Sequence, residues 1–283
     1  MGDRITCSVC PRHCLLADGQ LGACGVRRAS AVAGDTLCDA YGRLTSVALD
    51  PIEKKPLARF LPGSYVLSVG GYGCTMRCPF CQNYQISQAG ADDERWEQWE
   101  PAELVETARR MRQRDARVVG LAYTYNEPLA AWEYVRDCAV LAREAGLKNV
   151  LVSSANASTK VVQEVVPLLD AANIDLKGFN EAYYRWCGGD FATVKENIAF
   201  LARCENVHLE LTCLVVPGKN DSETEMDALA RWVAELDPQI TLHVSRFFGR
   251  YKLVDVAPTP VATVYRLADV ARRHLAHVYT GNC

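Results

Sequence analysis

The sequence predicts an α/β protein, a partial barrel of six strand–helix units that carries an N-terminal cysteine-rich, metal-binding appendage. From Ser64 onward, short apolar runs alternate with amphipathic helical stretches, whereas cysteine, glycine and arginine dominate the segment up to Pro62. Strands that alternate with helices form parallel sheets with right-handed crossovers. We therefore expect two parts, residues 1–62 and 63–283. A doubly wound open sheet is the alternative arrangement.

Six strands are predicted from short apolar runs at 65–70, 118–125, 149–154, 172–176, 207–215 and 241–247. Helical periodicity predicts helices at 101–114, 129–145, 159–169, 191–203, 222–236 and 260–275. Pro101 suits a first helical turn, and Gly146 stands where a C-terminal cap belongs. A short apolar run at 277–279 follows the last helix.

The charge and hydropathy of the chain exclude two classes of partner. The net charge is −3 over 283 residues, which disfavours binding to nucleic acid or to an anionic membrane surface. No apolar run approaches the roughly 20 residues that span a bilayer. The chain starts without the apolar stretch of a signal peptide, so we expect a cytoplasmic protein.

Thirteen cysteines are an unusual number for such a protein. A disulfide-rich secreted scaffold fits poorly, because those chains are short and use an even number of cysteines. Seven of the thirteen fall into two tight groups, which is typical of metal binding. The other six are scattered, and we expect most of them to be small buried residues.

The second cysteine group follows the first predicted strand and a glycine-rich turn. Cys74, Cys78 and Cys81 can hold three irons of a [4Fe–4S] cluster, which leaves the fourth iron open for another ligand. The alternative is zinc, but structural zinc needs four ligands and no obvious fourth is nearby. The glycines before Cys74 allow the backbone to wrap closely around a cluster.

This spacing, with the aromatic Phe80 before the last cysteine, resembles the signature of radical S-adenosylmethionine (SAM) enzymes. The resemblance implies that SAM chelates the open iron through its amino and carboxylate groups. One electron from the reduced cluster then cleaves SAM to methionine and a 5′-deoxyadenosyl radical, which abstracts hydrogen from a substrate. The protein orients these groups and excludes water.

Further motifs narrow the resemblance to the radical SAM enzyme of the AmmeMemoRadiSam system, which is related to the pyruvate formate-lyase activating enzymes. They occur in order at 50–57, 60–63, 81–83, 124–128, 175–177, 216–218 and 220–221. The resemblance implies an oxidoreductase that takes electrons from a flavodoxin or ferredoxin. It also suggests a partner protein as substrate, with a glycine as hydrogen donor.

The resemblance also assigns SAM-binding residues. Asn126 and Glu127 occupy the place of a Gly-Gly-Glu segment that binds the SAM amino group, although the two glycines are absent here. Backbone near Val216 would pack on the adenosine. Relatives carry Thr-Asn-Gly after the third strand, where this chain has Ser153-Ser154-Ala155-Asn156.

Strand periodicity points to charged side chains inside the barrel. Asp175 and Lys177 share one face of the fourth strand, opposite the apolar face that helices should cover. Buried charge is costly, so we expect them to serve SAM or substrate, with a structural ion pair as the alternative. The same argument makes Glu210 and His243 candidate substrate contacts, proton donors or neighbours of the SAM carboxylate, with satisfied polar residues of the core as the alternative.

The first cysteine group, Cys7, Cys10, Cys14 and Cys24, offers four thiolates around a short loop. Four ligands suit a closed site, either structural zinc or a second iron–sulfur cluster, and the sequence does not choose between them. For the whole chain we expect a radical enzyme. Radical modification of a small molecule and a non-catalytic iron–sulfur or zinc protein are the alternatives.

Overall fold

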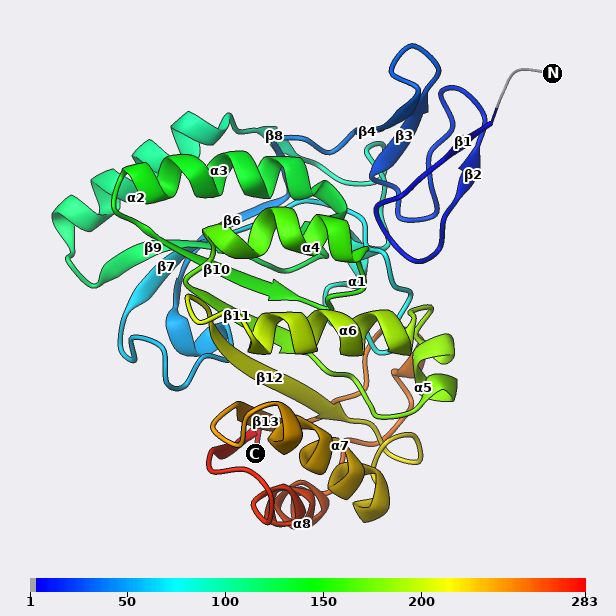
Figure 1. The fold of residues 1–283 in the computed structure, drawn as a ribbon, viewed down its shortest axis with the longest axis vertical. Helices are drawn as coiled ribbons and strands as arrows, with labels where there is room; N and C mark the ends of the chain where they lie inside the picture. Colours follow the sequence, from blue (N-terminus) through cyan, green and yellow to red (C-terminus); the bar gives the residue numbers. More distant parts are fainter. Residues whose placement is uncertain (1–3) are drawn as a thin grey trace.

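The computed structural model describes residues 4–283, and an eight-stranded sheet runs through its centre (Figure 1). The spatial order is β14-β13-β12-β11-β10-β9-β7-β6. Neighbouring strands from β7 to β14 are parallel, and β6 is antiparallel to β7. The bounds are β6 Ser46–Pro51, β7 Tyr65–Gly70, β9 Val118–Tyr123, β10 Lys148–Ser153, β11 Ala171–Asp175, β12 His208–Val215, β13 Thr241–Arg246 and β14 Val278–Gly281.

All six predicted strands are confirmed, with ends that differ by at most two residues. The predicted α/β class is also confirmed, and the sheet is open because β6 and β14 form its two edges. The short apolar run at 277–279 contributes to β14. The division at residue 62 remains a prediction, but β6 lies before it in the chain and belongs to the sheet.

Each helix that the periodicity predicts is present, and two short helices, Tyr84–Ser87 and Glu181–Trp186, were not predicted. Their bounds are α1 Tyr84–Ser87, α2 Pro101–Arg114, α3 Trp132–Glu144, α4 Thr159–Val165, α5 Glu181–Trp186, α6 Phe191–Ala202, α7 Glu223–Leu236 and α8 Val261–Ala271. Single 3-10 turns are η1 Ile52–Lys54, η2 Pro128–Ala131, η3 Val166–Leu168 and η4 Tyr251–Leu253.

Three predicted helices are shorter than expected; the one predicted at 260–275 ends at Ala271, and proline explains the other two. The helix predicted at 129–145 begins with η2, because Pro128 takes the first turn and the Glu127 side chain accepts a hydrogen bond from the Leu129 amide. The helix predicted at 159–169 ends early and continues as η3, since Pro167 has no N–H to donate.

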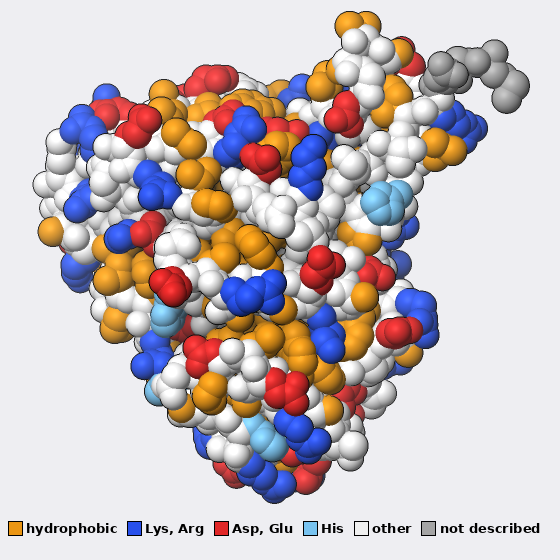
Figure 2. All heavy atoms as spheres, in the orientation of Figure 1, with side chains coloured by type: hydrophobic (Ala, Val, Ile, Leu, Met, Phe, Trp, Pro, Cys, Tyr) orange, Lys and Arg blue, Asp and Glu red, His pale blue; other side chains and the backbone are white. Residues whose placement is uncertain are grey.

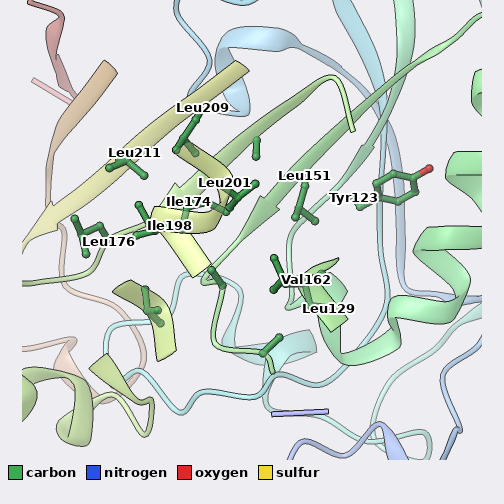
Figure 3. Packing of buried hydrophobic residues seen from close by; sticks show 14 of the residues in the cluster. Tyr123, Leu129, Leu151, Val162, Ile174, Leu176, Ile198, Leu201, Leu209 and Leu211 are labelled. Carbon is green, nitrogen blue, oxygen red and sulfur yellow. The ribbon is translucent and has the colours of Figure 1, made fainter. Parts of the chain in front are cut away.

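Helices cover one face of the sheet and form the main core with it. Ile174 of β11 belongs to the same buried cluster as Ile198 and Leu201 of α6 (Figure 3). This is the face that period-two alternation predicts for the apolar side chains of β11. The polar residues between them therefore face the other side of the sheet.

Before β6, the N-terminal segment forms short strand pairs, one of them with β8 from later in the chain, and β1 to β4 lie at one end of the molecule (Figure 1). The pairs are β1 Ile5–Thr6 with β2 Leu15–Leu16, β3 Arg27–Ser30 with β4 Asp35–Cys38, and β5 Arg43–Leu44 with β8 Glu97–Gln98. Arg27 is buried and donates to both carboxylate oxygens of Glu133 in α3, at 2.8 and 2.7 Å. This ion pair fastens β3 to the barrel.

The visible surface mixes charged side chains of both signs with hydrophobic ones, some of which adjoin one another (Figure 2). Within residues 4–283, no helix has the length and apolar character that crossing a membrane requires.

Candidate active site

A cavity of about 330 Å³ opens at the carboxyl ends of the parallel strands. Thr124, Ser153, Asp175, Leu214 and Ser245 line it, and they stand at or beside the ends of β9, β10, β11, β12 and β13. Because parallel strands end at the same edge of a sheet, residues far apart in sequence converge on this cavity.

The three predicted cluster ligands all line this cavity. Cys74, Cys78 and Cys81 lie in the loop after β7, and the Met76 amide donates to the Cys74 sulfur at 3.4 Å. Among residues 4–283, no three His, Cys, Asp or Glu side chains are gathered closely enough to hold a metal ion as they stand. Three thiols on one cavity wall nevertheless match the donor set of a [4Fe–4S] cluster with one open iron.

The other two thiols have neighbours from α1 and from the residue after α5. The sulfur of Cys81 lies 3.1 Å from the Ser87 hydroxyl oxygen. The neighbouring Cys187 side chain lowers the pKa of Cys78, whereas burial raises the pKa of Cys74 and of Cys81. Bound iron would favour the thiolate form of all three.

The turn before the cluster loop packs directly on the N-terminal segment. Gly73 has φ +76°, and a Cβ at this position would overlap the carbonyl oxygen of Cys24. That carbonyl accepts a hydrogen bond from the Cys74 amide at 3.2 Å, and Arg77 donates to the Ala23 carbonyl. Only glycine permits this contact, which joins the two cysteine groups through the backbone.

Asn126 holds the same turn from the barrel side. Its side-chain oxygen accepts from the Gly71 amide at 3.2 Å, and its amide nitrogen donates to the carbonyls of Tyr72 and Gly73 at 2.9 and 3.0 Å. Asn126 also lines the cavity. Its amide group therefore positions the cluster loop, a role that the sequence did not suggest.

The carboxylate of Glu127 is already fully hydrogen-bonded. One oxygen accepts from the Leu129 amide at 3.1 Å and the Ser153 hydroxyl at 2.7 Å. The other accepts from the Ser154 amide at 3.0 Å and the Ser154 hydroxyl at 2.5 Å. The serines that replace the Thr-Asn-Gly of relatives thus bind Glu127, which lies at the cavity wall but is only 1% exposed.

Asp175 and Lys177 meet at the end of β11, as the alternation predicts. The Lys177 ammonium donates to the Asp175 carboxylate at 2.9 Å, and both line the cavity. Burial alone would lower the pKa of Lys177, but the Asp175 carboxylate and the Cys78 thiolate outweigh it and raise that pKa well above its usual value. Lys177 is therefore a fixed positive charge beside the cysteines.

Val216 is buried and lies outside the cavity lining. Its amide donates to the Asn220 side-chain oxygen at 2.7 Å, and the Asn220 amide group donates to the Lys177 carbonyl at 2.7 Å. The 216–220 turn thus supports the backbone of Lys177, and the predicted adenosine contact remains a prediction.

Glu210 and His243 meet each other inside the barrel but do not line the cavity. Glu210 accepts from the Ala58 and Arg59 amides at 3.0 and 2.8 Å, and it bonds the rings of His208 and His243 at 2.8 and 2.6 Å. Burial would raise the pKa of Glu210, but the two histidines and two amides lower it to about 2. The two amide contacts hold the 58–59 segment and the other two hold the histidine rings, and the predicted role of Glu210 and His243 towards substrate remains a prediction.

Phe80 is buried beside the cavity and packs on α5. Its ring stacks on Tyr183 at 6.2 Å and tilts against Trp186 at 5.7 Å between centroids. Phe80 therefore supports the cluster loop from the helix side.

The segment after β6 forms a cavity wall that the sequence left without a role. Lys54 and Pro56 line the cavity, while Lys55 is buried and donates to Asp50 at 2.8 Å. The Tyr125 hydroxyl donates to the same carboxylate at 2.5 Å. Burial would raise the pKa of Asp50, but these hydrogen bonds lower it. The motif at 50–57, one of the ordered motifs in the sequence, was the signal that could have identified this wall.

The N-terminal cysteines lie close to one another. Burial raises the pKa of Cys10 to about 11, and the neighbouring thiolates of Cys24, Cys7 and Cys14 add to this rise. The Cys7 amide also donates to the Cys14 carbonyl at 2.9 Å. Among residues 4–283 these thiols are not gathered closely enough to hold a metal ion as they stand, so the closed four-thiolate site remains a prediction.

Comparison with known proteins agrees with the three-cysteine motif of this cavity. A family model described as the radical SAM superfamily matches residues 68–230. An uncharacterized protein of Methanocaldococcus jannaschii is 36% identical over 282 residues, which make up 99% of this chain and 82% of that protein.

Solved structures share the fold at low sequence identity. A domain of the pyruvate-formate lyase-activating enzyme from Bacteroides vulgatus has a TM-score of 0.51 and 16% identity, over 58% of this chain and 99% of that one. Streptococcus suis SuiB, bound to its precursor peptide SuiA, has a TM-score of 0.57 and 12% identity, over 77% of this chain and 48% of that one.

Proposed function

Because the chain belongs to the radical SAM superfamily, we propose that it is an activating-enzyme-like oxidoreductase whose cluster is held by Cys74, Cys78 and Cys81. The observation that carries this proposal is the meeting of the three thiols with Asp175 and Lys177 on one cavity. A bound, reduced [4Fe–4S] cluster supplies the electron that cleaves SAM to methionine and a 5′-deoxyadenosyl radical.

The residues around the cavity bind and orient SAM in this proposal. Lys177 provides a fixed positive charge for the SAM carboxylate, and Asp175 keeps that ammonium in place. Glu127 holds the 124–126 turn against Ser153 and Ser154, so that the turn presents its polar groups to the SAM amino group. These groups are pre-organised by burial, which reduces the cost of ordering them when SAM binds.

We propose a peptide or protein as substrate, with a backbone glycine as hydrogen donor, and a flavodoxin or ferredoxin as reductant. The ordered motifs that resemble the radical SAM enzyme of the AmmeMemoRadiSam system support this choice. So does the shared fold with an activating enzyme and with SuiB, a protein crystallised with its precursor peptide. All thirteen cysteines are unpaired, which suits a reducing, cytoplasmic location.

The test is anaerobic reconstitution with iron and sulfide, followed by dithionite and SAM. We expect 5′-deoxyadenosine by liquid chromatography, and none from Cys78→Ala protein. An intact cluster that yields no 5′-deoxyadenosine would overturn the proposal. A glycyl radical signal in a candidate partner protein, dependent on the enzyme and SAM, would identify the substrate class.

We further propose a closed metal site at Cys7, Cys10, Cys14 and Cys24, either zinc or a second iron–sulfur cluster. Metal analysis of a Cys74→Ala/Cys78→Ala/Cys81→Ala variant distinguishes the two. Residual iron and sulfide indicate a second cluster, and zinc without iron indicates a structural site. A variant that holds neither metal contradicts the proposal.

A further inference from the structure

The cluster loop has an outer side that faces away from the cavity. Cys78 and Phe80 line the cavity, whereas Arg77 and Pro79 do not. The Arg77 amide instead donates to the carbonyl of Cys187, the residue after α5, at 2.7 Å. The loop is therefore a thin wall, with the predicted iron ligands on its inner side and other segments of the chain against its outer side.

Two basic residues from distant segments contact this outer side. The amide of Lys252 in η4 donates to the Pro79 carbonyl at 3.0 Å, so Lys252 lies directly against the cluster loop. The Arg12 guanidinium donates to the Gly188 carbonyl at 3.4 Å, in the same turn after α5 that holds the Arg77 amide. Both side chains are exposed.

Lys219 reaches the same surface from the turn after β12. Its ammonium lies 4.9 Å from the centre of the Trp186 ring, a favourable cation–π distance. The Trp186 ring packs in turn on Phe80 of the cluster loop, with 5.7 Å between centroids. Lys219 is exposed as well. Three separate segments thus bring a positive charge to the outside of one short loop.

Neighbouring acids do not balance these charges. Among residues 4–283, no ion-pair partner is found for Arg12, Lys219 and Lys252. The acidic residues of the adjoining segments are Glu181, Asp190, Asp221 and Asp255. The first pairs with Arg185, the second caps α6, and the third accepts from the Gly218 amide. Arg250 offsets the fourth in charge. The surface is therefore positive, although the whole chain carries a net charge of −3.

We propose that this basic surface, formed by Arg12, Lys219 and Lys252, docks an acidic protein that delivers the electron to the cluster. The proposal rests on the proposed function, in which the cluster loop holds [4Fe–4S]. One electron passes across the loop, so the carrier is oxidised by one electron, the cluster is reduced by one, and no bond is made or broken. Opposite charge steers such an encounter and fixes its orientation.

The position of the surface favours an electron donor over a substrate. None of the three basic residues lines the cavity. A substrate has to enter the cavity to meet the radical, whereas an electron donor needs only to come close to the cluster. The outer side of the loop offers that approach and leaves the cavity free for SAM and substrate.

The first experiment measures binding of oxidised flavodoxin, an acidic electron carrier, to the reconstituted full-length enzyme by calorimetry. We expect Lys219→Glu/Lys252→Glu to raise the dissociation constant roughly tenfold at low ionic strength, and the difference should shrink as added salt screens the charges. The matched control is Arg114→Glu/Arg273→Glu, which changes the net charge equally at exposed positions before β9 and β14, at the amino ends of the strands. Its dissociation constant should change much less.

The second experiment compares two reductants in the absence of any substrate. With reduced flavodoxin below saturation, Lys219→Glu/Lys252→Glu should form 5′-deoxyadenosine roughly tenfold more slowly than the wild type. With dithionite, which needs no docking surface, the two proteins should react at the same rate. If the variant is also slower with dithionite, Lys219→Gln/Lys252→Gln, which removes the charges without reversing them, replaces it in both experiments.

The outcomes separate this inference from the proposed function. A wild-type enzyme that forms no 5′-deoxyadenosine with dithionite would defeat the proposed function, and the inference with it. Normal dithionite activity with unchanged flavodoxin binding in the Lys219 and Lys252 variants would overturn the inference alone. Equal weakening in the control variant would show a general charge effect, and that also overturns it. Unchanged flavodoxin binding with weaker binding of a protein substrate would assign the surface to the substrate instead.

Discussion

The contacts of Glu210 make its contribution to stability measurable. Its carboxylate accepts two backbone amides and bonds two histidine rings, and its side chain is completely buried. Substitution Glu210→Gln keeps the shape and removes the charge. The amide cannot satisfy all four partners, so the 58–59 segment loses part of its anchor.

The pH dependence of this loss follows from the lowered pKa. Folding takes the pKa of Glu210 from an ordinary value of 4.5 to about 2. The shift corresponds to about 3 kcal/mol of stability at neutral pH. Because the folded-state pKa is depressed, this contribution is fully present above the unfolded pKa and is lost as pH falls towards the folded value. Between about pH 5 and about pH 3, roughly 2 kcal/mol should disappear.

Urea unfolding of the metal-free, reduced protein, followed by circular dichroism, measures this effect. The difference in unfolding free energy between wild type and Glu210→Gln should narrow as pH falls from about 5 to about 3. Glu106→Gln is the control. The pKa of Glu106 is also lowered to about 2, mainly by Arg109, but Glu106 lies on the exposed surface of α2. Because solvent screens exposed charges, its contribution to the unfolding free energy should change little over the same pH range. A constant difference for Glu210→Gln, or equal narrowing for Glu106→Gln, would refute the reasoning.

Three further substitutions test how the cavity is assembled. Asn126→Ala removes three hydrogen bonds to the turn before the cluster loop, about 1 kcal/mol each, and should lower the iron content per chain. An iron content equal to that of the wild type would contradict this prediction. Glu133→Ala leaves Arg27 charged and buried, and should lower the unfolding free energy by about 3 kcal/mol in urea titrations; a change below about 1 kcal/mol would argue against a buried pair. Ser154→Ala removes one of the two hydrogen bonds to one oxygen of Glu127, the Ser154 amide being retained, and should weaken SAM binding roughly fivefold in calorimetry, whereas unchanged affinity would separate Glu127 from SAM.

Period-two alternation explains how much of the site could be predicted from the sequence. It placed Asp175 and Lys177 on the inner face of β11, and strand direction placed them at the carboxyl end. The same rule placed Glu210 and His243 inside the barrel, which is also correct. Alternation fixes the face of a strand but not the depth at which a side chain meets other segments. Glu210 meets Ala58 from a distant loop, and no local pattern encodes that pairing.

Roles that depend on contacts between loops could not be predicted from the sequence. Asn126 matches a motif position that suggested SAM binding, yet its amide group is engaged with the turn before Cys74. Cys187 looked like one of six scattered cysteines, because nothing in its neighbourhood except two glycines marks it. Such roles depend on the relative placement of loops, which side-chain periodicity does not describe.

Three segments far apart in the chain converge on the cluster loop, and their contacts fall on different parts of it. The Cys24 carbonyl accepts a hydrogen bond from the Cys74 amide, the Asn126 side chain holds the preceding turn, and the Cys187 carbonyl accepts a hydrogen bond from the Arg77 amide. Because each contact fixes a different point of the loop, the loss of one leaves two others to hold the cysteine ligands in place.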